Sequence, residues 1–260
     1  MEIATAYFPT TRGAYALVSP RAPLRDTPRS LPSRGSCAPV ERCGSLTLNA
    51  GDARLVDRIA VTRMRVRKGA TLFRAGDRFA ALYAICCGSF KTHVITDDGH
   101  AQVSGYHIAG DIIGSDGIGD DVHDCEAVAL EDAEVCALPF ERVETLARED
   151  VAFQRSLHRM LAGEIVRERG VMVMLGTMRA EQRLASFLLD LARRYQARGY
   201  SAREFVLRMT REDIGSHLGL TLETVSRLFS RFRDSGWIEV RGRTVKLLDR
   251  PALQRIMLAG

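Results

Sequence analysis

The spacing of apolar residues changes near residue 140 and predicts two kinds of structure. From Thr62 to Leu138 the β-branched runs are short and broken by glycine, a pattern typical of antiparallel strands. It predicts about eight short strands, the number that builds a small barrel or jelly roll. The expected turns are Lys68-Gly69, Gly76-Asp77, Asp98-Gly99 and Gly110-Asp111.

A long amphipathic helix is predicted from about Asp150 to Leu175, because apolar residues recur there at steps of three and four. Its stripe contains Phe153, Leu157, Met160, Leu161, Ile165, Val171, Met172 and Leu175. Two interpretations stay open: the stripe packs against the strands, or it pairs with a second copy as coiled-coil helices do. A second amphipathic helix is predicted over residues 180–199.

Two short helices around a glycine turn are predicted next. Thr210 with Asp213 matches a capping box that opens a helix, and Gly219 would end that helix. Thr221 can cap the following helix, which runs to about Asp234. Two strands across a glycine turn follow, so this segment predicts a winged helix-turn-helix.

Composition and charge agree with a soluble protein that contacts nucleic acid. The 260 residues are 46% hydrophobic and 27% charged, and neither a membrane span nor a secretory signal is recognisable, which predicts a cytoplasmic protein. The net charge is +5, but it is unevenly spread. Residues 90–132 contain ten acidic residues and Lys91 as the only lysine or arginine, whereas residues 203–250 are basic, as expected of a nucleic-acid surface.

The helix that Thr221 caps carries side chains suited to reading bases. Glu223, Ser226 and Arg227 leave one face near its N-terminus, and such groups can bind cytosine, base edges and guanine respectively. The alternative is a solvated helix with a Glu223–Arg227 ion pair. The residues predicted to contact DNA are Thr221, Glu223, Thr224, Ser226, Arg227, Arg231 and Arg243.

The motifs KGATLFRAGD, YHIAGDIIGSDGIG and LTLETVSRLF resemble, in order and spacing, the Crp/Fnr superfamily of bacterial transcription regulators, and specifically its oxygen-responsive Fnr-type branch. The resemblance covers roughly residues 37–255. It implies a β-roll sensor, a dimerisation helix and a winged helix-turn-helix that reads palindromic TTGAT-like half-sites, with RNA polymerase as a partner. The branch's Glu-x-x-Ser-Arg signature is matched by Glu223, Ser226 and Arg227, while Leu222 replaces the arginine of the cAMP-responsive branch.

The fold class expected is therefore α+β, in four parts. Residues 1–45 contain six of the eight prolines and are expected to be largely disordered. A cupin-like β-roll sensor domain is expected at 46–147, a dimerisation helix at 148–176 and the winged helix-turn-helix domain at 177–260. Ile165 and Glu168 are the predicted dimer switch: the resemblance implies that an acidic residue at Glu168 opposes association, by about 3 kcal/mol at an effective dielectric near 20.

The resemblance also implies an iron-sulfur sensor. Fnr-type proteins hold a [4Fe-4S] cluster through three N-terminal cysteines and one in the roll, matched here by Cys37, Cys43 and Cys136, with Arg34 at the remaining position. Four alternatives stay open: a substitute ligand, a thiol switch, another metal and no cofactor. The possible substitutes are Cys86, Cys87, Cys125 or a non-cysteine ligand, although Cys86 and Cys87 also suit simple packing in a strand.

Other ligands and activities fit the sequence poorly. Cyclic AMP is not expected, because His123 or Asp124 stands where the cAMP-binding relatives have a phosphate-binding arginine, and nearby carboxylates repel an anion. The sequence lacks the paired histidines, nucleophile elbow and phosphate loop of common enzymes, so no enzyme is predicted. Two alternatives remain: a ligand-sensing roll with weak DNA contact, and a Crp/Fnr regulator without a cluster.

Overall fold

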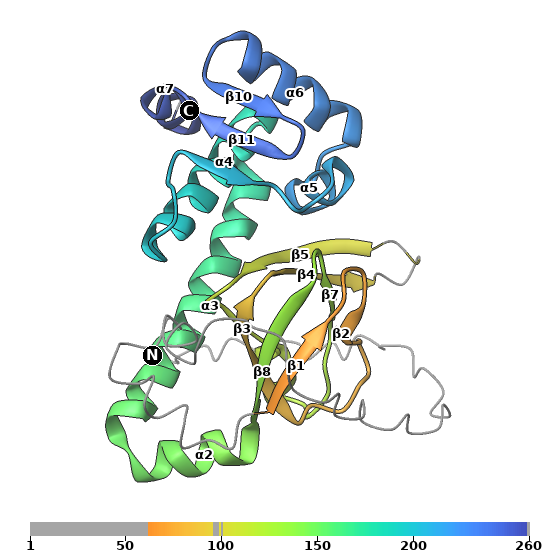
Figure 1. The fold of residues 1–260 in the computed structure, drawn as a ribbon, viewed down its shortest axis with the longest axis vertical. Helices are drawn as coiled ribbons and strands as arrows, with labels where there is room; N and C mark the ends of the chain where they lie inside the picture. Colours follow the sequence, from red (N-terminus) through yellow and green to blue (C-terminus); the bar gives the residue numbers. More distant parts are fainter. Residues whose placement is uncertain (1–61, 96–98, 100, 259–260) are drawn as a thin grey trace, which may run out of the picture. The chain divides into compact units, whose positions relative to one another are not determined.

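The computed structural model describes residues 62–95, 99 and 101–258 (Figure 1). The proline-rich segment 1–45 and the candidate ligands Cys37 and Cys43 therefore lie outside the described residues, as does part of the predicted Asp98-Gly99 turn.

The first part is the predicted antiparallel roll. Two four-stranded sheets form, in the orders β1-β8-β3-β6 and β2-β7-β4-β5, and the apolar residues between them include the fully buried Phe90, Ala127 and Val135. The strands are β1 (Thr62–Val66), β2 (Thr71–Phe73), β3 (Ala81–Cys87), β4 (Ser89–Ile95), β5 (Ala101–Ile108), β6 (Ile112–Ile113), β7 (Glu126–Ala129) and β8 (Ala133–Pro139). The 3-10 helix η2 (Ser115–Ile118) follows β6.

The predicted long helix is α3 (Val151–Thr177), and an additional helix, α2 (Phe140–Glu149), precedes it. The sequence pattern did not predict α2, whose buried residues are Val143 and Leu146. Asp150 separates the two helices, because its extended backbone ends α2 and its carboxylate caps the first amides of α3. Among the described helices, none is long and apolar enough to cross a membrane.

The C-terminal part begins with α4 (Ala180–Ala197) and contains the predicted helix-turn-helix. The helices α5 (Arg211–Leu218) and α6 (Leu222–Asp234) are followed by the wing strands β10 (Ile238–Arg241) and β11 (Thr244–Leu247). The sequence pattern missed β9 (Glu204–Val206), which extends the wing sheet in the order β10-β11-β9, and α7 (Arg250–Leu258).

Local capping explains where the two short helices begin and end. The Thr210 hydroxyl accepts from the Asp213 amide at 3.0 Å, and the Asp213 carboxylate accepts from the Thr210 amide at 2.9 Å, which is the predicted capping box. Gly219 ends α5 with φ at 62°, a conformation that glycine adopts without strain. The Thr221 hydroxyl accepts from the Thr224 amide at 3.2 Å and so caps α6.

Candidate nucleic-acid interface and sensor thiols

Helix α6 presents the predicted reading face to solvent. Its apolar side is buried through Val225, Leu228, Phe229 and Phe232. The opposite side exposes Glu223, Ser226 and Arg227 within the first two turns of the helix. The capped N-terminus of a helix also leaves backbone amides and a partial positive charge free to meet phosphate. The face therefore combines base-reading groups with an anion-attracting end.

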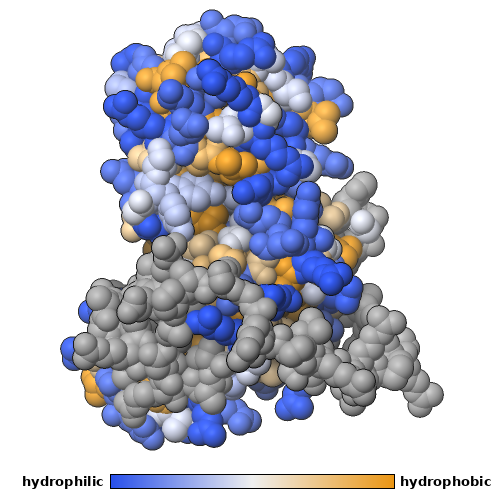
Figure 2. Space-filling view, in the orientation of Figure 1, coloured by the Kyte–Doolittle hydropathy of each residue, from blue (hydrophilic) through white to orange (hydrophobic). Residues whose placement is uncertain are grey.

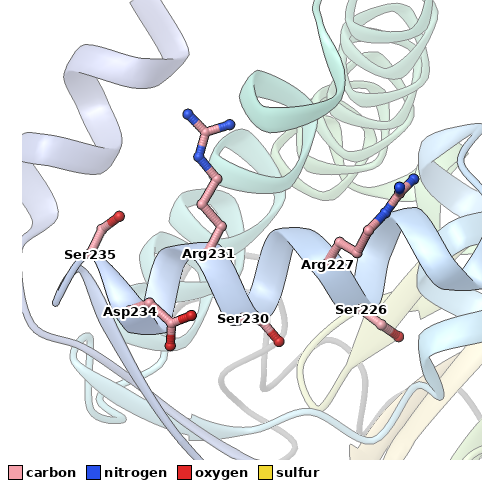
Figure 3. A pocket seen from close by; sticks show the side chains of 6 residues that line it. All are labelled: Ser226, Arg227, Ser230, Arg231, Asp234 and Ser235. Atoms are coloured by element: carbon pink, nitrogen blue, oxygen red, sulfur yellow. The ribbon is translucent and has the colours of Figure 1, made fainter.

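An open groove runs along the outer side of α6 (Figure 3). The guanidinium groups of Arg227 and Arg231 extend to one side of the helix, and the hydroxyls of Ser226 and Ser230 extend to the other. The lining is completed by Asp234 and Ser235. Polar groups that point in two directions from one helix can meet base edges and the backbone of a duplex together.

The basic side chains near this face make weak contacts that DNA can replace. Arg227 donates to the Thr224 hydroxyl at 3.3 Å, and no ion pair joins it to Glu223 within the described chain. Arg231 pairs with Glu181 of α4, a largely exposed interaction that stabilises little. On the wing, the exposed Arg243 donates to the Arg208 carbonyl at 3.4 Å. Figure 2 shows many hydrophilic residues on this domain.

The middle of α3 is apolar and exposed. Ile165, Val166, Met172 and Val173 are between 53% and 71% exposed. At 100° per residue these four side chains lie on one face of the helix. In the single chain, the packing of α3 against the roll therefore leaves this face exposed. This supports the interpretation that the stripe pairs with a second copy of the chain.

Glu168 is exposed at the edge of that face rather than at its centre. The neighbouring Arg167 pairs with Glu164 at 2.9 Å. The negative charge of Glu168 contributes to raising the pKa of Asp124 in the roll, after burial and the neighbouring Asp116. Glu168 thus stands near other negative charges.

The structure brings two of the sensor cysteines together. The Sγ atoms of Cys136 in β8 and Cys86 in β3 lie 3.1 Å apart. Cys87, by contrast, pairs across the ladder with Glu134. Of the three substitute cysteines considered, Cys86 is therefore the one in contact with Cys136.

Cys125 lies in a different environment, between the two sheets. Its thiol donates to the Asp116 carboxylate at 3.4 Å, and burial together with the charge of Asp116 raises its pKa. A thiol that resists ionisation is a poor metal ligand.

Oxygen and sulfur atoms of Asp116, Asp124 and Cys125 do lie within 4.8 Å of one another. His123 also contacts Asp116, at 3.1 Å.

A buried ion-pair cluster that the sequence pattern did not predict joins the roll to α4. Asp111, 2% exposed in the turn between β5 and β6, accepts from Arg194 at 2.5 Å and from Arg198. Burial alone raises the pKa of the Asp111 carboxyl, but the charges of the two arginines outweigh it and hold the pKa below its ordinary value. A signal did exist, because Arg194 follows Leu191 by three residues on the apolar stripe of α4, where a charge needs a partner.

Strand β5 and its neighbour β4 also contact helix α5 directly. Lys91 Nζ lies 2.5 Å from Asp213 Oδ1, so this aspartate both caps α5 and pairs with the roll. The Val103 amide donates to the Ser216 hydroxyl at 2.8 Å. Val103 and Tyr106 of β5 are buried in the same hydrophobic cluster as α4 and α5. The roll and the helix-turn-helix thus share a core.

One arginine joins the end of α3 to the end of α5. Arg183 donates from Nε to the Met178 carbonyl at 2.9 Å, from Nη2 to the Leu175 carbonyl at 2.8 Å and from Nη1 to the Leu218 carbonyl at 2.9 Å. These carbonyls lie at helix ends, where backbone acceptors lack partners within the helix.

Comparison with known proteins adds family matches to this geometry. Residues 63–150 match the family "Cyclic nucleotide-binding domain", and residues 182–256 match "Crp-like helix-turn-helix domain". The chain is 42% identical over 222 residues to the transcriptional regulatory protein btr of Bordetella pertussis, covering 85% of this chain and 92% of that protein. It is 40% identical over 220 residues to the fumarate and nitrate reduction regulatory protein of Escherichia coli, covering 85% and 88%.

A solved structure shares the fold. FixK2 from Bradyrhizobium japonicum superposes with a TM-score of 0.71 at 31% sequence identity, over 76% of this chain and 97% of that chain.

Proposed function

Because the chain belongs to the Crp/Fnr family of transcription regulators and carries the family's helix-turn-helix DNA-binding domain, we propose that it controls genes in response to oxygen or redox state. It does so as a cytoplasmic homodimer on a palindromic TTGAT-like site, with RNA polymerase as its partner and without catalytic activity of its own. Regulators of this family bind DNA and act as dimers.

The observation that carries the DNA-binding proposal is the exposed face of α6. Glu223, Ser226 and Arg227 are all exposed near the capped start of this helix, and the basic wing lies in the same domain. Two such helices in a symmetric dimer match successive major grooves about 34 Å apart, so a palindrome is the natural target. The exposed apolar face of α3 supports the homodimer, since a second copy would cover it.

An iron-sulfur cluster fits the donor atoms of the roll. Such clusters take thiolate ligands, and Cys136 stands beside a second thiol, that of Cys86. Cys37, Cys43 and Cys136 would hold the cluster, and a substitute ligand would take the position of Arg34. When bound, the cluster supplies a centre that reacts with oxygen.

The carboxylates of Asp116 and Asp124 lie close together in the roll and would repel the phosphate of cAMP. They support the further proposal that cAMP is not the ligand.

Changing Cys136 to serine is expected to lower the iron content of anaerobically prepared protein by at least half, because it removes a buried thiolate from an already incomplete set. Specific binding to a palindromic TTGAT duplex should fall with it. Iron and sulfide analysis, with gel retardation on the palindrome and on a scrambled duplex, measures both.

The matched control is Cys125→Ser. This change removes the thiol that donates a hydrogen bond to Asp116, and the variant should keep its iron. Wild-type protein without iron that still prefers the palindrome would reject the cluster and keep the regulator. Equal retention of both duplexes would reject sequence-specific binding itself.

Replacing Glu168 by alanine is expected to raise the dimer association constant of aerobically prepared protein about threefold. Two carboxylates about 6 Å apart in water repel by about 0.7 kcal/mol, and salt weakens this further. Because Glu168 is exposed to water, this repulsion is smaller than the value of about 3 kcal/mol at an effective dielectric near 20. Sedimentation at matched concentrations measures it, with Glu144→Ala on α2 as the control. An unchanged dimer fraction for Glu168→Ala would remove this residue from the switch.

A further inference from the structure

The contact between Cys86 and Cys136 has chemistry of its own. Their Sγ atoms are 3.1 Å apart, whereas carbon atoms in ordinary nonbonded contact lie about 3.5–4.0 Å apart. A disulfide bond measures about 2.05 Å, so an approach of about 1 Å would join the two sulfurs. The two thiols are already placed for reaction with each other.

The strand register explains why these two side chains meet. Ala84 pairs with Cys136 and Ile85 with Val135, but the ladder shifts between Ile85 and Cys87. Cys86 therefore stands at a bulge, where a side chain is turned away from its regular direction. Cys86 and Cys136 point to the same side of the sheet, since both pack in one hydrophobic cluster.

This cluster lies between the sheet and the helices that follow it. Cys136 is 3% exposed and belongs to the same cluster as Val143 and Leu146 of α2 and Phe153 of α3. Cys86 is half-buried at its edge and is the more accessible of the two thiols. The pair is thus shielded on one side and open to a small oxidant on the other.

We propose that Cys86 and Cys136 form a redox-active dithiol that is oxidised to an intrachain disulfide between β3 and β8. The oxidant is a small disulfide such as oxidised glutathione. The Cys86 thiolate attacks one sulfur of the oxidant and releases one thiolate; the Cys136 thiolate then attacks the Cys86 sulfur and releases the second. Two electrons pass to the oxidant, whose S–S bond is lost, and the two cysteine protons end on the two released thiols.

The disulfide rests on geometry alone, whereas its consequence rests on the proposed function. A sulfur bound in a disulfide is no longer a thiolate, so oxidation removes both Cys136 and the possible substitute Cys86 from the candidate cluster ligands. Cluster binding and the disulfide are then mutually exclusive, and reduction restores the ligand. After the cluster is lost, the disulfide would keep the iron-free protein oxidised and so mark oxidising conditions until it is reduced.

Peptide mapping tests the disulfide in full-length, iron-free protein. The protein is reduced, freed of reductant, incubated with oxidised glutathione, blocked with iodoacetamide and digested without reduction. We expect a linked pair of peptides that contain Cys86 and Cys136. Cys87→Ser, the matched control, should keep this link, and both Cys86→Ser and Cys86→Ala should lose it. Cys136 found unlinked, or joined to Cys37 or Cys43, would overturn the proposal.

Iron uptake separates this proposal from the cluster. Oxidised wild-type protein is expected to take up less than half the iron that the reduced protein takes up on anaerobic reconstitution without reductant. If the linked peptides form and the reduced protein takes up no iron, the cluster is rejected and the dithiol stands. If iron is taken up but the linked peptides never form, the dithiol is rejected and the cluster stands.

Discussion

Replacing Asp111 by alanine is expected to lower the free energy of unfolding by about 3–5 kcal/mol, because it leaves two buried guanidinium groups without their carboxylate. Asp111 receives hydrogen bonds from both Arg194 and Arg198. The Nε atoms of both arginines already have no hydrogen-bond partner in the described part of the chain. Urea unfolding of the two proteins measures the difference.

Asp190→Ala is the matched control for this prediction. Asp190 pairs with Arg193 at 2.6 Å and stands 3.9 Å from Arg194, but its side chain is 41% exposed. Its removal should cost less than about 1 kcal/mol. A similarly small loss for Asp111→Ala would show that water reaches and solvates the two arginines.

The same ion pairs predict an acid dependence. The pKa of Asp111 in the folded protein lies below its ordinary value, because the charges of Arg194 and Arg198 outweigh the opposing effect of burial. The stabilisation is therefore complete above the unfolded pKa of about 3.9 and is lost as the pH falls through the folded value. The difference between wild type and Asp111→Ala should shrink below about pH 4.

Arg227→Ala is expected to weaken binding to the palindromic site by about 1–3 kcal/mol, which is about 5- to 150-fold, by removing a contact with a base. The loss on random DNA should be much smaller. Titration of both duplexes at one salt concentration measures the two values. The effect is large because Arg227 extends freely from the exposed face of α6, bonded only to the Thr224 hydroxyl in the described chain.

Arg243→Ala on the wing is the comparison for Arg227. A phosphate contact carries no sequence information, so this change should weaken both duplexes equally and lower the salt dependence by about one unit of slope. An equal loss on both duplexes for Arg227→Ala would instead assign Arg227 to the phosphate backbone.

The helix-turn-helix was predictable because its boundaries depend on neighbouring residues. Thr210 and Asp213 cap each other across three positions, and Gly219 and Thr221 set the turn between the helices. Such capping contacts are encoded locally, so the sequence shows them directly. The strands of the roll were predictable for a related reason, namely short β-branched runs broken by glycine.

The contacts between distant segments were not predictable in this way. Strand β9 has three residues and is recognisable through its pairing with β11. The Cys86–Cys136 contact joins positions fifty residues apart and depends on a register shift that no local pattern reveals. The partners of Asp111 lie more than eighty residues away, Arg194 in α4 and Arg198 at its C-cap. Tertiary packing decides all three features.

Arg183 couples the long helix to the helix-turn-helix. Its guanidinium donates to carbonyls at the end of α3 and at the end of α5 at once, so it couples the two helix ends. A side chain added at Gly219 would place its Cβ 3.2 Å from Arg183 Nη1, so the turn is shaped around this clamp. A displacement of α3 against a partner is therefore passed to α5, the helix that precedes α6. The contacts of Asp111 with Arg194 and of Lys91 with Asp213 connect the roll to the same unit.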